Sequence, residues 1–526
     1  MDDTSVSARQ RYAALEAGRT PFLDRARDCA RLTVPYLLPP AGFSAASKLE
    51  TPFQSLGARG IRVLGSKLLL SLFPPNTPFF RYQIDDQALQ QLTQSDAMRG
   101  TVEQALAARE KAVLAEMESA LFRPAAFVAL QQIIVAGNVL LYVPPTGRVR
   151  VFRLDQFVVK RDASGNLLEI VVKETVARAA LDQSTRDALA AALHKDTRPG
   201  DEQKDLDLYT RIHLVSGMWQ VYQEICDIEV PESRGSYRPE ALPWLPLRLT
   251  VQPGEDYGRS YVEEYLGDLD SLEGLVEAIV EGSAAAARVI FLVSPNGTVQ
   301  MRQFAKARTG DTLAGNADDV GVVQTNRQVD LSVARQQAQD IAQSLSYAFM
   351  LNAAVQRSGE RVTAEEIRYM ASELDDALGG VYTLLGAEFQ LPVVRLFERR
   401  MEKNRKVPAL PGDLVQPQIV TGLQAIGRGY DQQNLKLFVA DIISVLGPEL
   451  AMKFLNPQEF MKRSAASYGI DPGGLLASDE QIAAQEQQAQ LMALVQQLGP
   501  QALQQLGGMA QTQMKIDNPP PTKQAA

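Results

Sequence analysis

The spacing of the hydrophobic residues changes along the chain, and the first part of the chain has a helical pattern. From Ala8 to about Leu121 the apolar residues recur mostly three or four positions apart, as on a helix with one buried face. A segment that begins near Phe53 ends at a cluster of prolines from Pro74 onward, because proline cannot continue a helix. This segment is expected to pack as a buried helix.

Three runs with strand patterns follow, at residues 133–145, 149–174 and 208–230. Turn signals at residues 164–166 and 216–217 lie inside the second and third runs, and all three runs are interpreted as β-hairpins. Residues 178–206 have the pattern of a helix and a charged loop, and this helix should cap the sheet. The N-terminal half is therefore expected to be mixed α+β.

Two long helices and an insertion come next. Apolar residues at helical steps from Tyr261 to Ile290 predict one amphipathic helix, and a second is predicted from about Asp330 to Asn352. The residues between them are rich in Gly, Asn and Thr and have weak periodicity, which is typical of an insertion. The alternating three- and four-residue steps of the second helix suit packing against a neighbouring helix, so the two are expected to lie together.

A third helix begins at a capping box at Thr363, and we expect it to bend at residues 379–380, where two glycines are adjacent. A boundary is predicted near residue 405. Further helices are expected between 422 and 465 and after Ser478, and the Gln- and Pro-rich end of the chain should be disordered.

Composition narrows the class of protein. The chain has 526 residues, more than one hydrophobic core usually supports, so at least two packed units are expected. It is 45% hydrophobic and 22% charged, as an ordinary globular protein is. The net charge of -9 argues against a simple nucleic-acid coat, because phosphate binding relies on clustered Lys and Arg. Any DNA contact must be local or weak.

Targeting signals and membrane spans are not predicted. The N-terminus is acidic and polar, unlike a secretory signal. The most apolar stretch, residues 127–143, is interrupted by Gln131, Gln132 and Asn138 and is too short to cross a bilayer as a helix. Two cysteines in a chain of this length make no disulfide framework, which favours a reducing cytoplasm as the site of synthesis.

The sequence carries no strong signal for chemistry. Cys29, Cys226, His194 and His213 are scattered singly, and neither a GxxxxGK[ST] loop nor a GxSxG elbow occurs. Paired acids at 268 and 270, or at 375 and 376, could hold Mg²⁺ for a nuclease, although acids on helices are usually a solvated face. We therefore predict no enzyme, no metal and no cofactor.

Several long segments carry a resemblance to a known family. The strongest are SYVEEYLGDLDSLEGLVEAIV and LSYAFMLNAAVQRSGERVTAEEIRYMASELDDALGGVYTLL, and TPFQSLGARGIRVLGSKLLLSLFP, VAGNVLLY and PQIVTGLQAIGRG extend the match. They resemble the portal (head-to-tail connector) proteins of T7-like short-tailed bacteriophages over nearly the whole chain. The fold class that this implies is α+β, mainly helical: the portal fold, assembled as a closed ring of about twelve identical subunits around a channel.

The resemblance also implies a division of the chain into regions. These are a wing (1–264), a stem helix (265–294), a clip (295–330), a second stem helix (331–352), a tunnel loop (353–363), a wing helix and connection (364–421), a crown (422–500) and a disordered tail (501–526).

The implied function is a channel at one capsid vertex, through which double-stranded DNA is packaged and ejected without sequence specificity. The implied partners are further copies of this chain, the terminase large subunit, tail adaptor and tail tube proteins, major capsid and scaffolding proteins and internal core proteins. No membrane is involved. The protein would nucleate procapsid assembly and reside in the virion after synthesis in the host bacterial cytoplasm. A different virion protein, such as a tail adaptor or vertex component, is the competing class, and an enzyme is the third.

Three sets of site residues follow. The acids Asp270, Glu273, Glu277 and Glu281 share one helix face, which either repels DNA inside the channel or is a solvated outer face. The tunnel-loop residues Gln356, Arg357, Ser358, Gly359, Glu360 and Arg361 would contact the DNA backbone, or their arginines would form ion pairs between subunits. The clip residues Arg302, Lys306 and Arg308 would contact phosphates or an acidic partner, although three cations on a surface loop are also ordinary.

Overall fold

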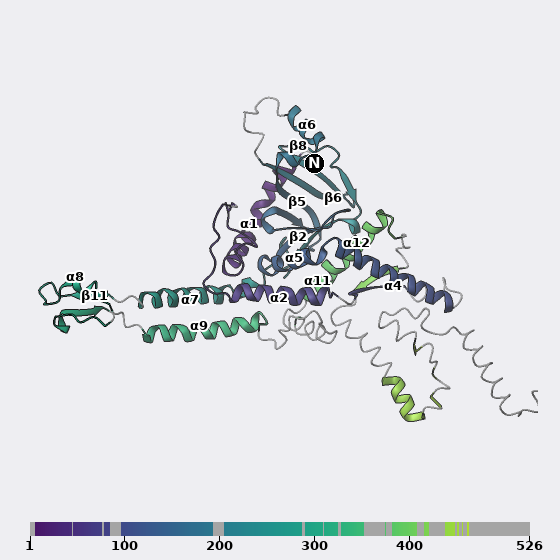
Figure 1. The fold of residues 1–526 in the computed structure, drawn as a ribbon. Coiled ribbons are helices and arrows are strands. Elements are labelled where there is room, and N and C mark those ends of the chain that lie inside the picture. Colours follow the sequence, from purple (N-terminus) through teal and green to yellow (C-terminus); the bar gives the residue numbers. More distant parts are fainter. Residues whose placement is uncertain are drawn as a thin grey trace, which may run out of the picture. The chain divides into compact units, whose positions relative to one another are not determined.

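The fold is known from a computed structural model, which describes part of the chain. The described residues are 6–44, 46–75, 78–84, 96–192, 205–286, 290–308, 310–323, 328–351, 374, 381–407, 415–419, 437–447, 450–451, 455 and 460–461. The chain forms two compact units, residues 1–426 and residues 427–526. Figure 1 labels several of the helices and strands.

Three helices form the centre of the first unit. They are α1 (Ala8–Leu32), α2 (Leu56–Leu72) and α5 (Phe122–Ala136), and both α1 and α2 pack on α5. The helix predicted to begin near Phe53 is α2, and its burial is confirmed, since Ile61, Leu64 and Leu72 are fully enclosed. Helix α4 (Asp96–Ser119) packs beside α5.

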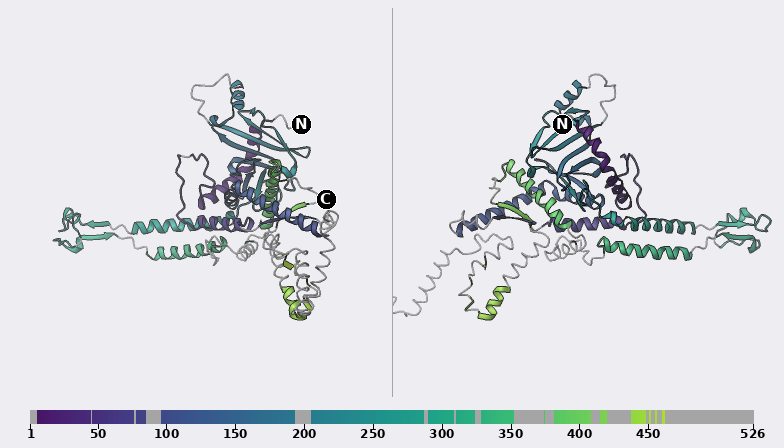
Figure 2. Two further views of the ribbon diagram at one scale, coloured as in Figure 1. Left: turned by 45° about the vertical axis from the view of Figure 1, so that its right-hand side comes forward. Right: turned by 180° about the vertical axis from the view of Figure 1, so that it is seen from behind.

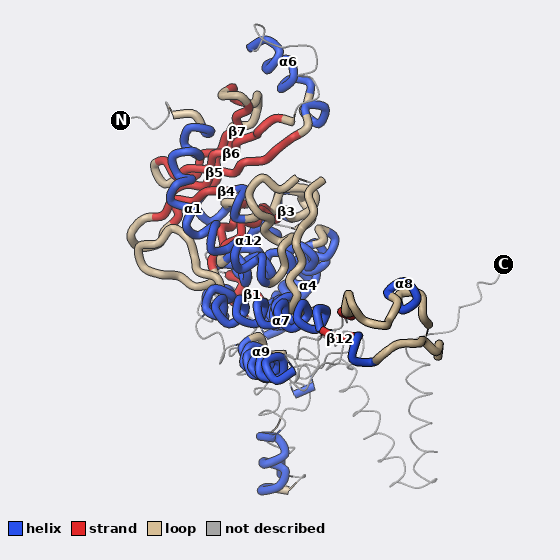
Figure 3. The backbone as a smooth tube through the Cα atoms, turned by 90° about the vertical axis from the view of Figure 1, so that its left-hand side faces the viewer, coloured by secondary structure: helices blue, strands red, loops and turns tan. Residues whose placement is uncertain are grey.

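A six-stranded antiparallel sheet lies against α1 (Figure 3). Its strands are β4 (Phe157–Arg161), β5 (Leu167–Val176), β6 (Leu206–Val215), β7 (Met218–Ile225), β8 (Ile228–Glu229) and β9 (Gly235–Tyr237). Tyr12 of α1 packs on Val158, Val171 and Tyr209 on one face of the sheet. The hairpins predicted around the turns at 164–166 and 216–217 are confirmed as β4–β5 and β6–β7.

The prediction of a β-hairpin at residues 133–145 is partly wrong. Residues 133–136 belong to α5, and only the next residues form a strand, β2 (Asn138–Tyr142). Helix α5 is buried on nearly all sides, so its apolar run has the same pattern as a buried strand. Strand β2 pairs with β3 (Arg150–Phe152) and with β10 (Trp244–Arg248) in a three-stranded sheet.

A further antiparallel pair joins distant parts of the chain. It consists of β1 (Phe80–Ile84) and β13 (Val415–Ile419), with Tyr82 opposite Pro417. The sequence did not predict either strand, because β1 lies in the region with a helical pattern and β13 follows a proline-rich break. The two strands pair across most of the chain, so no local hairpin signal reveals them.

The two long helices are present, but the first is shorter than predicted. Helix α7 (Leu266–Ala286) and helix α9 (Gln328–Ala348) lie side by side, as expected (Figure 2). The prediction that the first helix continues to Ile290 is wrong, because β11 (Ile290–Val293) starts there and pairs with β12 (Val320–Val323). Ile290 fits the helical spacing, but it also opens an apolar run that pairs with three valines and a glycine on β12.

Helical structure through about residue 403 is confirmed where the structure describes it. It runs from α11 (Val381–Leu385) through a π-turn η8 (Gly386–Gln390) into α12 (Leu391–Lys403). The π-turn precedes Pro392, whose missing N–H prevents the regular helical hydrogen bond to residue 388. The Thr363 capping box and the expected bend at 379–380 lie outside the described residues.

The helix expected between the hairpins is α6 (Gln183–Ala192). It contacts β8 at the edge of the sheet. Residues 193–204, which belong to the predicted charged loop, lie outside the described residues. The remaining short elements are η2 (Leu154–Gln156), η3 (Arg178–Ala180), η5 (Pro239–Ala241), η6 (Val262–Tyr265), α8 (Met301–Phe304) and η7 (Ala317–Asp319).

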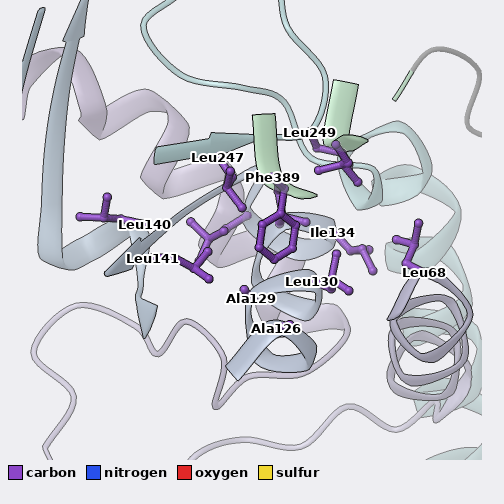
Figure 4. Packing of buried hydrophobic residues seen from close by; sticks show 14 of the residues in the cluster. Leu68, Ala126, Ala129, Leu130, Ile134, Leu140, Leu141, Leu247, Leu249 and Phe389 are labelled. Carbon is purple, nitrogen blue, oxygen red and sulfur yellow. The ribbon is translucent and has the colours of Figure 1, made fainter. Parts of the chain in front are cut away.

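Aromatic and aliphatic side chains from distant segments fill the core. The Phe73 ring makes edge contacts with Phe79, Phe122 and Phe389, so it joins the ends of α2, β1, α5 and η8. Figure 4 shows Phe389 among leucines of α5 and β10. The π-turn is therefore part of the core.

In the second unit a helix spans Leu437–Leu446, within the region where helices were predicted. Across the described residues, no single helix has the length and apolarity to span a membrane, although Ala105–Ser119 and Phe122–Ala136, bent by 70°, meet those criteria together.

Candidate functional site

The paired helices α7 and α9 are the element on which the predicted acidic stripe lies. They approach closely at Gly282, where an added Cβ would come within 3.0 Å of Leu331 Cδ2. Leu269 and Leu272 of α7, and Leu345 of α9, are buried. Beyond Val276 most of the described α7 side chains are exposed. The C-terminal half of α7 is therefore only partly covered by the rest of the chain.

The first two acids of the stripe already have partners inside the chain. Asp270 forms an exposed ion pair of 3.3 Å with Arg31 of α1. The Glu273 carboxylate accepts hydrogen bonds from the backbone N–H groups of Phe53 and Gln54, at 2.7 and 3.1 Å. Glu273 therefore holds α7 to the residues that lead into α2, a role that its helix position alone did not show.

Glu277 and Glu281, in contrast, are exposed and have no ion pair with any other residue that the structure describes. Their spacing places them on the same side of the helix, one turn apart. Of the four predicted acids, these two are available for an electrostatic role. Whether they face a channel stays a prediction.

The C-terminal end of α9 is held firmly in place. Phe349 is fully buried and packs on Gly60 of α2, where a Cβ would come within 2.6 Å of its ring. The Tyr261 hydroxyl donates a 2.8 Å hydrogen bond to the carbonyl of Ala348, and the Lys67 ammonium donates one of 3.3 Å to the carbonyl of Met350. Burial raises the pKa of Tyr261, so it stays a donor at any physiological pH.

These contacts fix the point from which the predicted tunnel loop starts. Met350 has a φ of 53°, the left-handed conformation that often ends a helix, and the Leu351 N–H returns to the carbonyl of Ser346. The predicted tunnel-loop residues Gln356, Arg357, Ser358, Gly359, Glu360 and Arg361 lie outside the described residues.

The three predicted clip cations lie in and after α8 and are all exposed. Two of the nearby acids are engaged locally: Asp311 accepts from the Arg308 backbone N–H at 2.7 Å, and Asp319 accepts from the Thr298 N–H at 2.6 Å and its hydroxyl at 2.8 Å. The bonds from Thr298 lower the pKa of Asp319. The side chains of Arg302, Lys306 and Arg308 are thus accessible to a partner.

Buried ion pairs were not predicted from the sequence. The Arg211 guanidinium is fully buried on β6 and pairs with Glu169 of β5 at 2.8 Å, and Arg11 of α1 pairs with the same carboxylate at 2.6 Å. Arg19 of α1 is also buried and donates to the carbonyls of Leu154 and Phe157. These contacts attach α1 to the sheet, so these cations have structural roles.

The geometry offers little for catalysis. Burial raises the pKa of the Cys29 thiol to about 12, which makes it a poor nucleophile. Among the described residues, no group of three or more His, Cys, Asp or Glu side chains is placed to hold a metal ion.

Comparison with known proteins identifies the family. The family model described as "Bacteriophage head to tail connecting protein" matches residues 6–476. The portal protein of Escherichia phage T7 is 42% identical over 90% of this chain and 89% of its own length, and that of Enterobacteria phage T3 is 40% identical over 99% and 96%. The portal protein of Enterobacteria phage SP6 is 30% identical over 94% of this chain and 95% of its own length.

The chain belongs to the family of bacteriophage head to tail connecting proteins. The relatives that it matches at full length are portal proteins of short-tailed phages, and the predicted portal role is confirmed. It is a virion component, and the family indicates no catalytic activity. A solved chain from the neck of an empty gene transfer agent particle covers 80% of this chain and 91% of its own length at 13% identity, with a TM-score of 0.34.

Proposed function

We propose that copies of this chain close into a ring of about twelve subunits around a channel for double-stranded DNA. Supporting this are the family membership and the exposed apolar side chains on the paired helices: Val280 on α7 is 49% exposed, and Val333 and Tyr347 on α9 are 65% and 63% exposed. Large apolar side chains on a soluble helix pair favour burial against another protein surface. Neighbouring copies in a ring would provide that surface.

Within the ring, α7 and α9 form the stem, the β11–β12 segment the clip, the mixed α+β region the wing, and residues 422–500 the crown. The ring would sit at one capsid vertex and nucleate procapsid assembly. The major capsid, scaffolding and internal core proteins are its partners there. Synthesis would take place in the host cytoplasm.

The channel proposal rests on Glu277 and Glu281, whose side chains are exposed and form no ion pair with any other described residue. If they line the stem, like charge keeps DNA phosphates from adhering while the duplex slides. The proposed channel lining includes only two of the four predicted acids, since Asp270 and Glu273 already have partners that hold α7 in place.

The test is a double charge reversal, Glu277→Lys with Glu281→Lys, in a packaging assay with purified rings. A ring with these changes should bind DNA more tightly and package at least about tenfold less of it, while ring formation is unchanged. The matched control reverses two exposed acids on other elements, Glu50→Lys and Glu232→Lys. Equal packaging by the wild type and the stem variant would sink the channel assignment.

We further propose that residues 353–363 form a tunnel loop and that Arg357 and Arg361 contact the DNA backbone there. This proposal rests on the sequence and on the anchored end of α9, which supports the start of the loop. Deleting residues 356–360 should leave rings intact and impair packaging or DNA retention. Loss of the rings themselves would favour ion pairs between subunits instead.

The exposed clip cations are proposed to dock the terminase large subunit during packaging, and the tail adaptor and tail tube proteins afterwards. Replacing Arg302, Lys306 and Arg308 by Gln removes the charge and keeps side chains of similar length. Binding of purified terminase to the ring should then fall by at least about tenfold, because charge pairs steer such encounters. Unchanged binding of both terminase and the tail adaptor would remove these residues from the docking surface.

A further inference from the structure

Two segments far apart in the sequence form one basic surface on the first unit. The end of α12 lies against the loop between β2 and β3, where the Arg400 guanidinium donates a 2.8 Å hydrogen bond to the carbonyl of Gly147. Asn404 donates a 3.5 Å bond to the carbonyl of Pro145. These bonds hold the loop that carries Arg148 against the end of α12.

Three of these cations have no counter-ion among the described residues: Arg148, Lys403 and Arg405, which we call the basic patch. All three are exposed. The carboxylates nearby are already engaged, since Glu116 pairs with Arg400 and Lys406, Glu402 pairs with Arg109, and Glu240 pairs with Arg399. The surface therefore carries positive charge in a protein whose net charge is -9.

Helix stability does not account for the whole patch. Cations near a helix C-terminus interact favourably with the helix dipole, which explains Lys403. Arg148 comes from a different segment, and Arg405 has a φ of 56°, the left-handed position after a helix where glycine is usual. An arginine there costs about 1 kcal/mol in backbone strain. The turn at this position does not call for an arginine, so neither the helix dipole nor the turn explains why Arg148 and Arg405 are both cationic.

We propose that the basic patch binds the sugar–phosphate backbone of double-stranded DNA. This inference rests on the proposed DNA-handling function of the ring and extends it to a second surface. The patch lies on α12 and the β2–β3 loop, whereas the proposed channel acids lie on α7. Exposed guanidinium and ammonium groups bind regularly spaced phosphates without reading the bases. The patch would hold DNA that is not in transit through the channel.

The test measures binding of assembled, full-length rings to covalently closed circular DNA, which cannot thread the channel. The variant carries Arg148→Gln, Lys403→Gln and Arg405→Gln. Three exposed cations on other elements, Arg9, Lys48 and Arg186, are replaced by Gln in a control with the same change in net charge. Affinity is measured over a series of salt concentrations, in parallel with polyglutamate as an acidic peptide probe.

The patch variant should bind closed circles at least about tenfold more weakly than the control, and the slope of log K against log salt should fall by about 0.9 for each lost phosphate contact. Equal binding by variant and control would overturn the proposal. It would also be overturned if polyglutamate bound more tightly than DNA and lost affinity in the same variant, since the partner would then be an acidic protein. Particle images of the same samples report ring formation separately, so failure of the ring proposal is distinguishable.

Discussion

At the scale of single residues, the structure gives physical reasons for several positions within the segments that resemble portal proteins. Gly137 ends α5 with a φ of 70°, and an added Cβ would lie 2.5 Å from the backbone carbonyl carbon of Arg259. The adjacent Asn138 side chain bonds both the N–H and the carbonyl of Gly258. The sequence VAGNVLLY therefore contains a turn that brings two backbone segments into contact.

Replacing Gly137 by Ala should destabilise the protein by about 3 kcal/mol or more, since positive φ and backbone overlap both oppose the methyl group. Gly254→Ala is the matched control: its φ is 83°, but no atom lies within 4 Å of the new Cβ. The control should lose only about 1 kcal/mol. Urea unfolding of both variants checks this, and equal losses would contradict the close-approach explanation.

Glu273 and Glu277 lie one turn apart on α7, and we expect them to differ in function. Glu273→Gln should cost about 1–2 kcal/mol, because a charged acceptor of two backbone N–H groups is lost. Glu277→Gln should leave the free energy of unfolding unchanged to within about 0.5 kcal/mol, as is usual for an exposed position. Equal effects in denaturant unfolding would show that the structural role of Glu273 is misassigned.

At the scale of elements, the sequence predicted the helices that have a long periodic pattern and the hairpins that have a clear turn signal. The β4–β5 and β6–β7 hairpins and the α7–α9 pair were found because glycine turns and helical periods are local signals. Strands β1 and β13 were missed, since they are short and pair across most of the chain. The end of α7 was misplaced because Ile290 satisfies both a helical and a strand pattern.

The candidate site was predicted in part. Like charges one helical turn apart show a common face, so the acids of α7 could be found from their spacing. The sequence could not show that Asp270 and Glu273 are bound to α1 and to the residues before α2. The basic patch was missed for the same reason, because the loop that carries Arg148 and the end of α12 come together only through folding.

Helices α4 and α12 are joined by charges, which makes their packing sensitive to pH. Glu116 is buried between Arg400 and Lys406, and these cations, Lys406 foremost, hold the pKa of Glu116 below its usual value. The folded protein thus releases this proton more readily than the unfolded chain does. The stabilisation is complete above the unfolded pKa of about 4.5 and is lost as pH falls through the lower folded pKa.

Glu116→Gln should therefore destabilise the protein by about 2 kcal/mol at neutral pH and by progressively less as pH falls below about 4.5. Thermal unfolding of wild type and variant over a pH series measures the difference. A difference that stayed constant down to about pH 3 would contradict a charge-based contact between α4 and α12.

At the scale of the whole molecule, the paired helices α7 and α9 leave apolar and acidic side chains exposed in a single chain, and the proposed ring would account for both features. Val333 and Tyr347 would be covered by neighbouring copies, while Glu277 and Glu281 would remain in water facing the channel. The quaternary state of the purified protein therefore tests the proposed ring.

Negative-stain electron microscopy of the purified full-length protein tests this most directly. We predict end-on views of closed rings with a central hole and about twelvefold rotational symmetry. Particles that remain monomeric at concentrations of tens of micromolar, with no closed rings in any buffer that keeps the chain folded, would contradict the account.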